Sequence, residues 1–330
     1  MKIIVDAFGG DNAPLSNVQG AADAVRELGA EVILVGDEEK LQKCAKDNGI
    51  VLDGIEIVHA PDVMDIHDDP NTILKSNKNT SLAVAFTLLK EGKGDAVVSA
   101  GSTGAILFGA TFIVKRMKGI KRPALATVMP TTGRPTLLLD CGANLNCRPE
   151  VLYQFGVLGS VYMENVMGIK NPSVGLLNNG SEDTKGGDVL VETYSLLKNS
   201  KLNFIGNIEA RDVPTGACDV LVADGFAGNI VLKLTEGVAS SFMGMIKDTF
   251  MKNIITKLCA AVLKPGLREL KKKTDYSEIG GAPLLGISKP VIKAHGSSNA
   301  KAIKNAIRQA MSFASLDTES LIGGKMADAE

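Results

Sequence analysis

Short apolar runs alternate with longer amphipathic stretches along most of the 330-residue chain. Ten of the short runs have the length and continuity of buried strands: 2–7, 31–35, 55–59, 96–99, 124–129, 136–140, 173–177, 203–206, 219–223 and 291–294. Stretches with helical spacing of apolar residues lie between many of them, including 15–28, 82–91, 150–165, 188–198 and 229–247. This alternation predicts an α/β fold with a mostly parallel sheet and helices on both faces.

Polar loops that carry glycine follow several of these apolar runs. They occupy residues 7–11, 99–104, 140–144, 178–181, 223–226 and 294–297. Loop amides at the strand ends of α/β sheets bind small anions. We therefore expect these loops to gather at one edge of the sheet, as the phosphate-type site of an enzyme.

Composition narrows the possible partners. The net charge is −1, tryptophan is absent and aromatic residues make up 4%, which disfavours nucleic-acid binding. Residues 247–273 nevertheless carry eight basic and two acidic side chains, a net +6, so the remainder carries −7. Five scattered cysteines without paired spacing indicate reduced cytosolic thiols and no metal site. We expect no signal peptide before the first strand and no membrane-spanning run.

Two loops carry the groups expected to bind an anion. In Gly101-Ser102-Thr103-Gly104, glycines allow close approach of the backbone and hydroxyls donate hydrogen bonds. This loop matches neither dinucleotide nor ATPase phosphate motifs, and it could instead be a plain helix start. The loop that contains Asn179, Glu182 and Lys185 offers one lysine to a dianion or oxyanion, with Glu182 to hold it. A solvated loop lysine is the alternative.

Two further loops carry titratable groups. Asp224 ends a predicted strand, where it can orient a base or ligand, or only cap the following helix. Asn229 lies where that helix begins. His295 precedes a predicted helix at 299–314 and supplies an imidazole beside free amides.

Six segments together resemble the bacterial acyl-ACP:phosphate acyltransferase (PlsX) family, where ACP is acyl carrier protein. They are Ile4–Pro14, Val98–Ala105, Asp140–Asn144, Glu182–Gly186, Asp224–Asn229 and His295–Ser297, in the family's order over nearly the whole chain. The segment Lys75–Ser81 departs from the family pattern, which has adjacent basic residues before two serines.

This resemblance implies a three-layer α/β/α fold like that of isocitrate dehydrogenases and phosphotransacetylases. One sheet would be shared by two intertwined subdomains, roughly 1–122 with 285–330 and 123–284, in a homodimer. The implied reaction converts fatty acyl-ACP and inorganic phosphate to acyl-phosphate and ACP, without a cofactor. The product would feed a membrane glycerol-3-phosphate acyltransferase in phospholipid synthesis.

Hydrogen phosphate is itself a nucleophile, so positioning and oxyanion stabilisation can supply most of the rate. The hypothesis is that the 101–104 loop and Lys185 hold phosphate against the thioester carbonyl. Asn144, Asn179 or Asn229 would donate to the oxyanion, and Asp224 or His295 would handle the proton. The remaining predicted substrate-binding residues are Gly10, Asp11, Glu182, Gly225, Gly296 and Ser297. In a rival covalent route, Cys141 would accept the acyl group first.

Two basic segments predict further contacts. Ile254, Leu258 and Val262 continue an apolar stripe from Phe250 beside a lysine cluster, which favours reversible contact with the anionic inner face of the cytoplasmic membrane. Burial in the core or a dimer interface is the alternative. Residues 115–122 hold five positive charges, which would suit acidic ACP or form a solvated turn.

Three other functions remain open at this stage. A phosphotransacetylase acting on short acyl-CoA would use the same chemistry. A dehydrogenase on this fold would need a nucleotide motif and metal-binding aspartates, and neither is clear in the sequence. A scaffold for ACP at the membrane would leave the glycine loops without a purpose.

Overall fold

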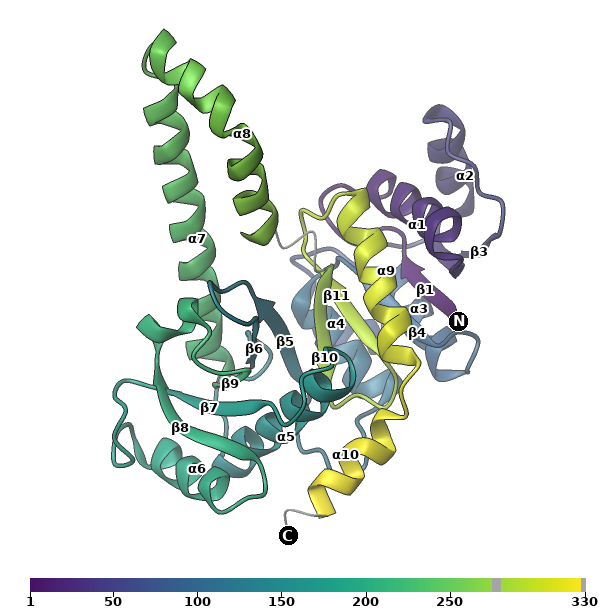
Figure 1. Ribbon diagram of the computed structural model, residues 1–330. Coiled ribbons are helices and arrows are strands. Elements are labelled where there is room, and N and C mark those ends of the chain that lie inside the picture. The colour runs from purple at the N-terminus through teal and green to yellow at the C-terminus, as the bar shows by residue number, and fades with distance from the viewer. Residues whose placement is uncertain (275–279, 328–330) are drawn as a thin grey trace.

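Eleven strands pair into one sheet in the computed structural model, which describes residues 1–274 and 280–327 (Figure 1). Their order across the sheet is β3-β2-β1-β4-β11-β10-β5-β6-β9-β7-β8. The bounds are β1 Lys2–Asp6, β2 Glu31–Gly36, β3 Ile55–His59, β4 Ala96–Ser99, β5 Ala124–Met129, β6 Thr136–Leu139, β7 Ser173–Asn178, β8 Asn203–Glu209, β9 Val220–Val222, β10 Gly281–Leu285 and β11 Val291–Ala294. All ten predicted strands are present, which confirms the α/β class, and β10 was not predicted.

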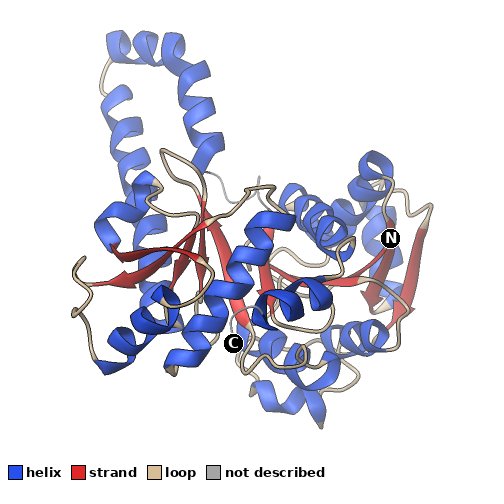
Figure 2. Cartoon of the chain, turned by 60° about the horizontal axis from the view of Figure 1, so that its bottom comes forward, coloured by secondary structure: helices blue, strands red, loops and turns tan. Residues whose placement is uncertain are grey.

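Helices cover both faces of this sheet (Figure 2). Their bounds are α1 Leu15–Leu28, α2 Glu38–Asp47, α3 Ser81–Lys90, α4 Thr103–Gly109, α5 Pro149–Asn165, α6 Asp188–Lys198, α7 Gly225–Phe250, α8 Ile254–Thr274, α9 Ala300–Ala314 and α10 Thr318–Ala327. Shorter helical turns are η1 Pro70–Leu74, η2 Ala110–Val114 and η3 Ala210–Thr215.

The core is divided into two apolar layers by the sheet. On β1, Ile3 and Val5 belong to the layer that holds residues of α1, α5 and α9, whereas Ile4 belongs to the layer that holds residues of α3 and α4. Successive strand residues point to opposite faces, so a strand buried on both faces is a continuous apolar run. This explains why the central strands are recognisable in the sequence.

Strand direction reverses in the middle of the sheet. β11 is parallel to β4, but the pairs β11–β10, β10–β5 and β5–β6 are antiparallel, and β9 and β7 then run parallel to β6. Three reversals make β7 antiparallel to β4, so their carboxyl ends point to opposite edges. The expectation that all polar loops share one edge was therefore wrong. The two-subdomain division stays a prediction.

Helices α7 and α8 form an antiparallel hairpin that projects from the α/β body (Figure 1). α7 runs on to Phe250 and α8 starts at Ile254, so the predicted 250–263 stripe begins at the turn of the hairpin. Ile254, Leu258 and Val262 are 72%, 64% and 80% exposed, which excludes burial in the core of this chain. The basic side chains from Arg268 to Lys273 lie outside the described ones.

Candidate active site

A buried carboxylate ties together the loops after β1 and β4. Asp6 accepts hydrogen bonds from the hydroxyls of Ser81 and Ser99, both at 2.6 Å, and from the Phe8 amide at 3.3 Å. Burial raises the pKa of this carboxyl, and these hydrogen bonds oppose that rise. A side chain at Gly9 would collide with Asp6 and with the Gly101 amide. The glycine therefore lets the two loops meet.

The same N-terminal loop also binds the loop after β11. The Asp11 amide donates to the Gly296 carbonyl at 2.8 Å, and Asn12 Nδ2 donates to the Ser297 carbonyl at 3.1 Å. Gly10 has a φ of +99°, a conformation that strongly favours glycine. The predicted residues Gly10, Asp11, Gly101, Gly296 and Ser297 thus belong to one connected group of loops.

A pocket of about 190 Å³ adjoins these loops, over β5 and β10. Loops from β4 and β11 form one wall and α7 forms the other, at the place where strand direction reverses. The lining residues are Thr103, Leu125, Thr127, Val128, Cys141, Asn229, Leu232, Lys233, Glu236, Gly280, Gly281, Ala282, Lys293, His295 and Gly296.

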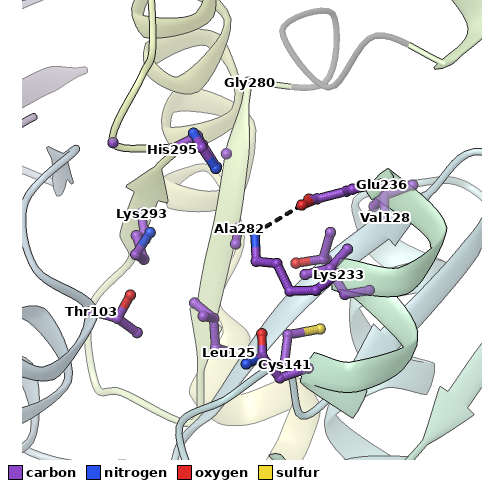
Figure 3. Close-up of a pocket in the computed structure, with 15 residues that line it drawn as sticks. Thr103, Leu125, Val128, Cys141, Lys233, Glu236, Gly280, Ala282, Lys293 and His295 are labelled. Atoms are coloured by element: carbon purple, nitrogen blue, oxygen red, sulfur yellow. Dashed lines mark hydrogen bonds and ion pairs between the residues drawn. The ribbon is translucent and has the colours of Figure 1, made fainter. Parts of the chain in front are cut away.

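The pocket holds more positive than negative groups. Lys233 reaches across it from α7 and forms an ion pair with Glu236 at 2.8 Å, while Lys293 and His295 lie on the facing wall (Figure 3). Lys293 Nζ donates to the Ala294 carbonyl at 3.4 Å, and no described carboxylate lies within ion-pair distance of it. Desolvation lowers the pKa of Lys293, as does the charge of Lys233. An anion bound here would stabilise the charged form of Lys293 and so oppose both the desolvation and the repulsion by Lys233.

His295 is held by its own loop. Its Nδ1 lies 2.8 Å from Ser297 Oγ, and the Ser297 amide donates to Nδ1 at 3.2 Å. Desolvation lowers the pKa of His295, and Lys233 and Lys293 lower it further. The imidazole is therefore neutral near pH 7, and because Nδ1 accepts from the Ser297 amide, the ring proton lies on Nε2.

Four predicted site residues line the pocket: Thr103, Asn229, His295 and Gly296. Ser102 and Gly104 flank Thr103 at the start of α4. The sequence analysis missed Lys233, Glu236 and Lys293. The one sequence signal for Lys293 was a lysine inside the apolar run of β11.

Three other predicted residues have structural contacts at the start of α7. The Asp224 side chain caps this helix by accepting from the Ala227 amide at 2.7 Å. Asn144 is buried, and its Nδ2 donates to Pro123 and to Asp140. The Gly225 amide donates to the Asn144 carbonyl at 2.8 Å. The structure therefore shows the capping alternative for Asp224, while its catalytic role stays a prediction.

The lysine loop after β7 does not contribute to the pocket lining. Lys185 Nζ lies 3.8 Å from Glu182 Oε1, the contact that the sequence suggested, and Lys185 is 47% exposed. Asn179 belongs to the same loop. β7 runs in the same direction as β6 and β9, and the segments after β6 and β9 supply Cys141 and Asn229 to the pocket, but no residue of the β7 loop lines it. The roles of Asn179, Glu182 and Lys185 stay predictions.

Cys141 lines the pocket but is a poor nucleophile. Its thiol donates to the Leu138 carbonyl at 3.3 Å, and burial raises its pKa to about 12. Only the thiolate attacks thioesters efficiently, and a thiol with this pKa forms very little thiolate near neutral pH. The geometry therefore disfavours a covalent acyl-cysteine route.

Comparison with known proteins settles the family. The sequence model of the family described as fatty acid synthesis protein matches residues 1–320. The chain belongs to this family. Its relatives include phosphate acyltransferases from Clostridioides difficile, 48% identical over 95% of this chain and 92% of the relative, and from Brevibacillus brevis, 49% identical over 98% and 96%.

Solved structures support the fold of this family member. A phosphotransacetylase from Streptococcus pyogenes has a TM-score of 0.63, and the EutD phosphotransacetylase from Staphylococcus aureus has 0.62. Each is 18% identical to this chain, and each alignment covers 94% of both chains. This likeness confirms the fold expected from the sequence.

Proposed function

We propose that this chain is a phosphate acyltransferase that moves a fatty acyl group from acyl-ACP to inorganic phosphate. The observation that carries the proposal is the pocket between β11 and α7, where two lysines face a single carboxylate beside a hydroxyl and an imidazole. Such a pocket suits a dianion. Membership of a family whose relatives are named phosphate acyltransferase supports this chemistry.

The reaction needs no covalent intermediate on the protein. A phosphate oxygen attacks the thioester carbonyl carbon, a tetrahedral oxyanion forms, and the carbon–sulfur bond then breaks to release ACP as its thiol. Lys293 and Lys233 hold the phosphate, with the Thr103 hydroxyl as a third contact. His295 orients the phosphate by donating from Nε2–H, and the phosphate proton passes to the departing sulfur. Asn229 donates to the oxyanion.

The volume of the pocket limits which part of the substrate it can enclose. Its volume is several times the roughly 30 Å³ of a water molecule in the liquid, enough for phosphate and the thioester head. A long acyl chain must extend beyond it. The product, an acyl-phosphate, is an activated acyl donor suited to a membrane glycerol-3-phosphate acyltransferase, which we propose as the next enzyme.

The hairpin of α7 and α8 exposes apolar side chains that suit two further contacts, one with a second copy of the chain and one with a membrane. Phe226, Ile230, Leu234, Val238 and Phe242 recur every four residues on α7 and are 44–64% exposed, a stripe wide enough to pack against a second copy in a homodimer. On α8, Ile254, Leu258 and Val262 are exposed near Lys252 and Lys257, which suits reversible binding to an anionic, inner-face membrane. In the described residues, no helix has the length and apolar character to cross a bilayer.

The test is direct detection of the product. Purified protein is incubated with phosphate and either palmitoyl-ACP or acetyl-CoA, and acyl-phosphate is trapped with hydroxylamine as the hydroxamate. We expect the product from palmitoyl-ACP. Turnover of acetyl-CoA in preference to palmitoyl-ACP would instead favour a phosphotransacetylase, the alternative kept from the sequence. Absence of hydroxamate from both donors would exclude both enzymes.

A further inference from the structure

A second, larger cavity lies beside α4 and has no role in the site described above. It is a groove of about 520 Å³. Leu107, Phe108 and Phe112 line its apolar side, and the rings of Phe108 and Phe112 are 4.4 Å apart. Phe112 is 55% exposed. A large aromatic ring left open to solvent beside a cavity is typical of a ligand-binding surface.

Three cations, Arg116, Lys121 and Arg122, line the groove together with this apolar side. Arg116 donates to the Lys121 carbonyl, and Arg122 Nη1 donates to the Asn146 carbonyl at 3.4 Å. These carbonyls orient the guanidinium groups without cancelling their charge. Within the described part of the chain, no carboxylate lies within ion-pair distance of either arginine, and Lys121 is 3.8 Å from Glu150.

The groove and the reaction pocket share their boundary elements. Thr103 lines the pocket and its neighbour Gly104 lines the groove, at the first turn of α4. In the loop after β6, Cys141 lines the pocket and Asn144 lines the groove. A ligand in the groove would therefore end within reach of the groups that bind phosphate.

We propose that this groove receives the phosphopantetheine arm of ACP, while the acidic surface of the carrier docks on the surrounding cations. The proposal rests on the proposed function. The arm carries a phosphodiester, then a chain of alternating amide and alkyl groups, and ends in the thioester. Arginine binds phosphate in a forked geometry, which assigns the phosphodiester to Arg116 and Arg122. The alkyl parts lie along Phe108 and Phe112, and the thioester reaches Thr103.

The positive charge around the groove favours an acidic carrier protein over a neutral partner. Residues 115–122 contain five basic side chains, of which three line the groove. Complementary charge accelerates docking and selects partners, and its effect falls with added salt. A neutral thioester without a carrier has no use for these cations.

The test compares two doubly substituted proteins with the wild type. Arg116→Glu/Arg122→Glu reverses two charges at the groove, and Lys43→Glu/Lys46→Glu makes the same charge change on the exposed side of α2. Steady-state rates are measured with palmitoyl-ACP and with a small palmitoyl thioester of N-acetylcysteamine. We expect the groove variant to raise KM for palmitoyl-ACP about tenfold at low salt. Its KM for the small thioester and for phosphate should match those of the control variant and the wild type.

Other outcomes separate this inference from the proposed function. An unchanged KM for palmitoyl-ACP, with acyl-phosphate still formed, would overturn the groove assignment and leave the function standing. Equal rises for both thioesters would also overturn it. So would a change of oligomeric state, which would make the groove an interface between copies. Absence of acyl-phosphate from the wild type would refute the function itself. Should the variant unfold, Arg116→Gln/Arg122→Gln replaces it and should show a smaller rise.

Discussion

At the residue scale, two lysines that sequence inspection passed over form the charge of the pocket. Loop residues such as Thr103 and His295 are recognisable because glycine and hydroxyl neighbours mark a turn at a strand end. Lys233 lies within a helix and Lys293 within a strand, where lysine usually faces solvent. Their meeting depends on how α7 packs beside β11, and no local pattern encodes that packing.

Replacing Lys293 tests the anion site. Lys293→Met removes the charge and keeps the length of the side chain, so we expect KM for phosphate to rise and kcat/KM for phosphate to fall about a hundredfold. KM for acyl-ACP should change little, and Lys293→Arg should restore part of the loss. Lys43→Met serves as a control on the surface of α2. An unaffected KM for phosphate would remove Lys293 from the site.

The lysine loop after β7 gives a contrasting prediction. If the pocket lysines hold the phosphate, Lys185→Ala should leave KM for phosphate within about threefold of wild type, as for most exposed side chains. A collapse of turnover in Lys185→Ala would restore the role that the sequence first suggested. The same steady-state assay measures both variants, so the two lysines are compared directly.

The pH profile tests His295. Protonation would place a hydrogen on Nδ1 against the Ser297 amide, and because the pKa of His295 is lowered, kcat/KM should fall only as the pH drops through that lowered value. Lys233→Met removes a positive neighbour and should raise the His295 pKa, shifting the acid limb to higher pH. His295→Gln should abolish the acid limb of the kcat/KM profile that Lys233→Met shifts. His67→Gln, in an exposed loop, should leave this limb unchanged. An identical limb in His295→Gln would assign the titration to another group.

The buried thiol gives a negative test. Cys141→Ala should keep wild-type turnover within about twofold, because a thiol with a pKa near 12 supplies no nucleophile. It should lose about 1 kcal/mol of unfolding free energy through the small cavity left behind. Intact-protein mass spectra of enzyme mixed with acyl-ACP should show no acyl adduct. An adduct lost in Cys141→Ala would revive the covalent route.

At the element scale, continuous apolar runs made most strands predictable, and interruptions hid the rest. β10 contains Gly281 and Pro283, which shorten its apolar run to a few residues. The turn of the hairpin was not predicted, because Phe250 and Ile254 continue the same apolar spacing from the end of α7 to the start of α8. The spacing could not show whether this face is covered, since a stripe facing a core and a stripe facing a partner look alike.

Charges on α8 test its membrane contact. Leu258→Glu/Val262→Glu places two carboxylates on this exposed stripe, and we expect most of the protein to leave the fraction that floats with phosphatidylglycerol vesicles at low salt. Activity with acyl-ACP in vesicle-free solution should be unchanged. Thr256→Glu/Ala260→Glu makes the same charge change of −2 on the same helix and leaves the apolar stripe and Lys257 in place. Co-flotation of the Leu258/Val262 variant at the wild-type level would exclude this surface.

At the scale of the whole molecule, the pocket combines loops from both halves of a sheet whose strand direction reverses in the middle. The sequence predicted strands and their ends, but not that β10, β5 and β6 alternate in direction. Antiparallel pairing depends on contacts between residues far apart in the chain, which apolar spacing does not record. Direction alone does not decide which loops meet, because the segments after β6 and β9 supply Cys141 and Asn229 to the same pocket as Thr103 of the loop after β4.

The α7 stripe tests whether two molecules associate. Leu234→Glu/Phe242→Glu lies midway along the helix, and we expect the mass measured by light scattering to fall from a dimer to one chain. Lys233 and Glu236 lie on the same helix, so activity should be measured alongside. A wild-type protein that elutes as a single chain would refute the homodimer.

The position of β11 also constrains how the chain is made. Val291 of β11 pairs in the middle of the sheet with Val97 of β4, a strand synthesised far earlier. While the ribosome is still elongating, one side of β4 has no neighbour, and its open backbone groups are exposed to pairing with other nascent chains. When the protein is expressed without a chaperone that shields such edges, the yield of soluble protein should therefore be lower than the stability of the finished fold would suggest.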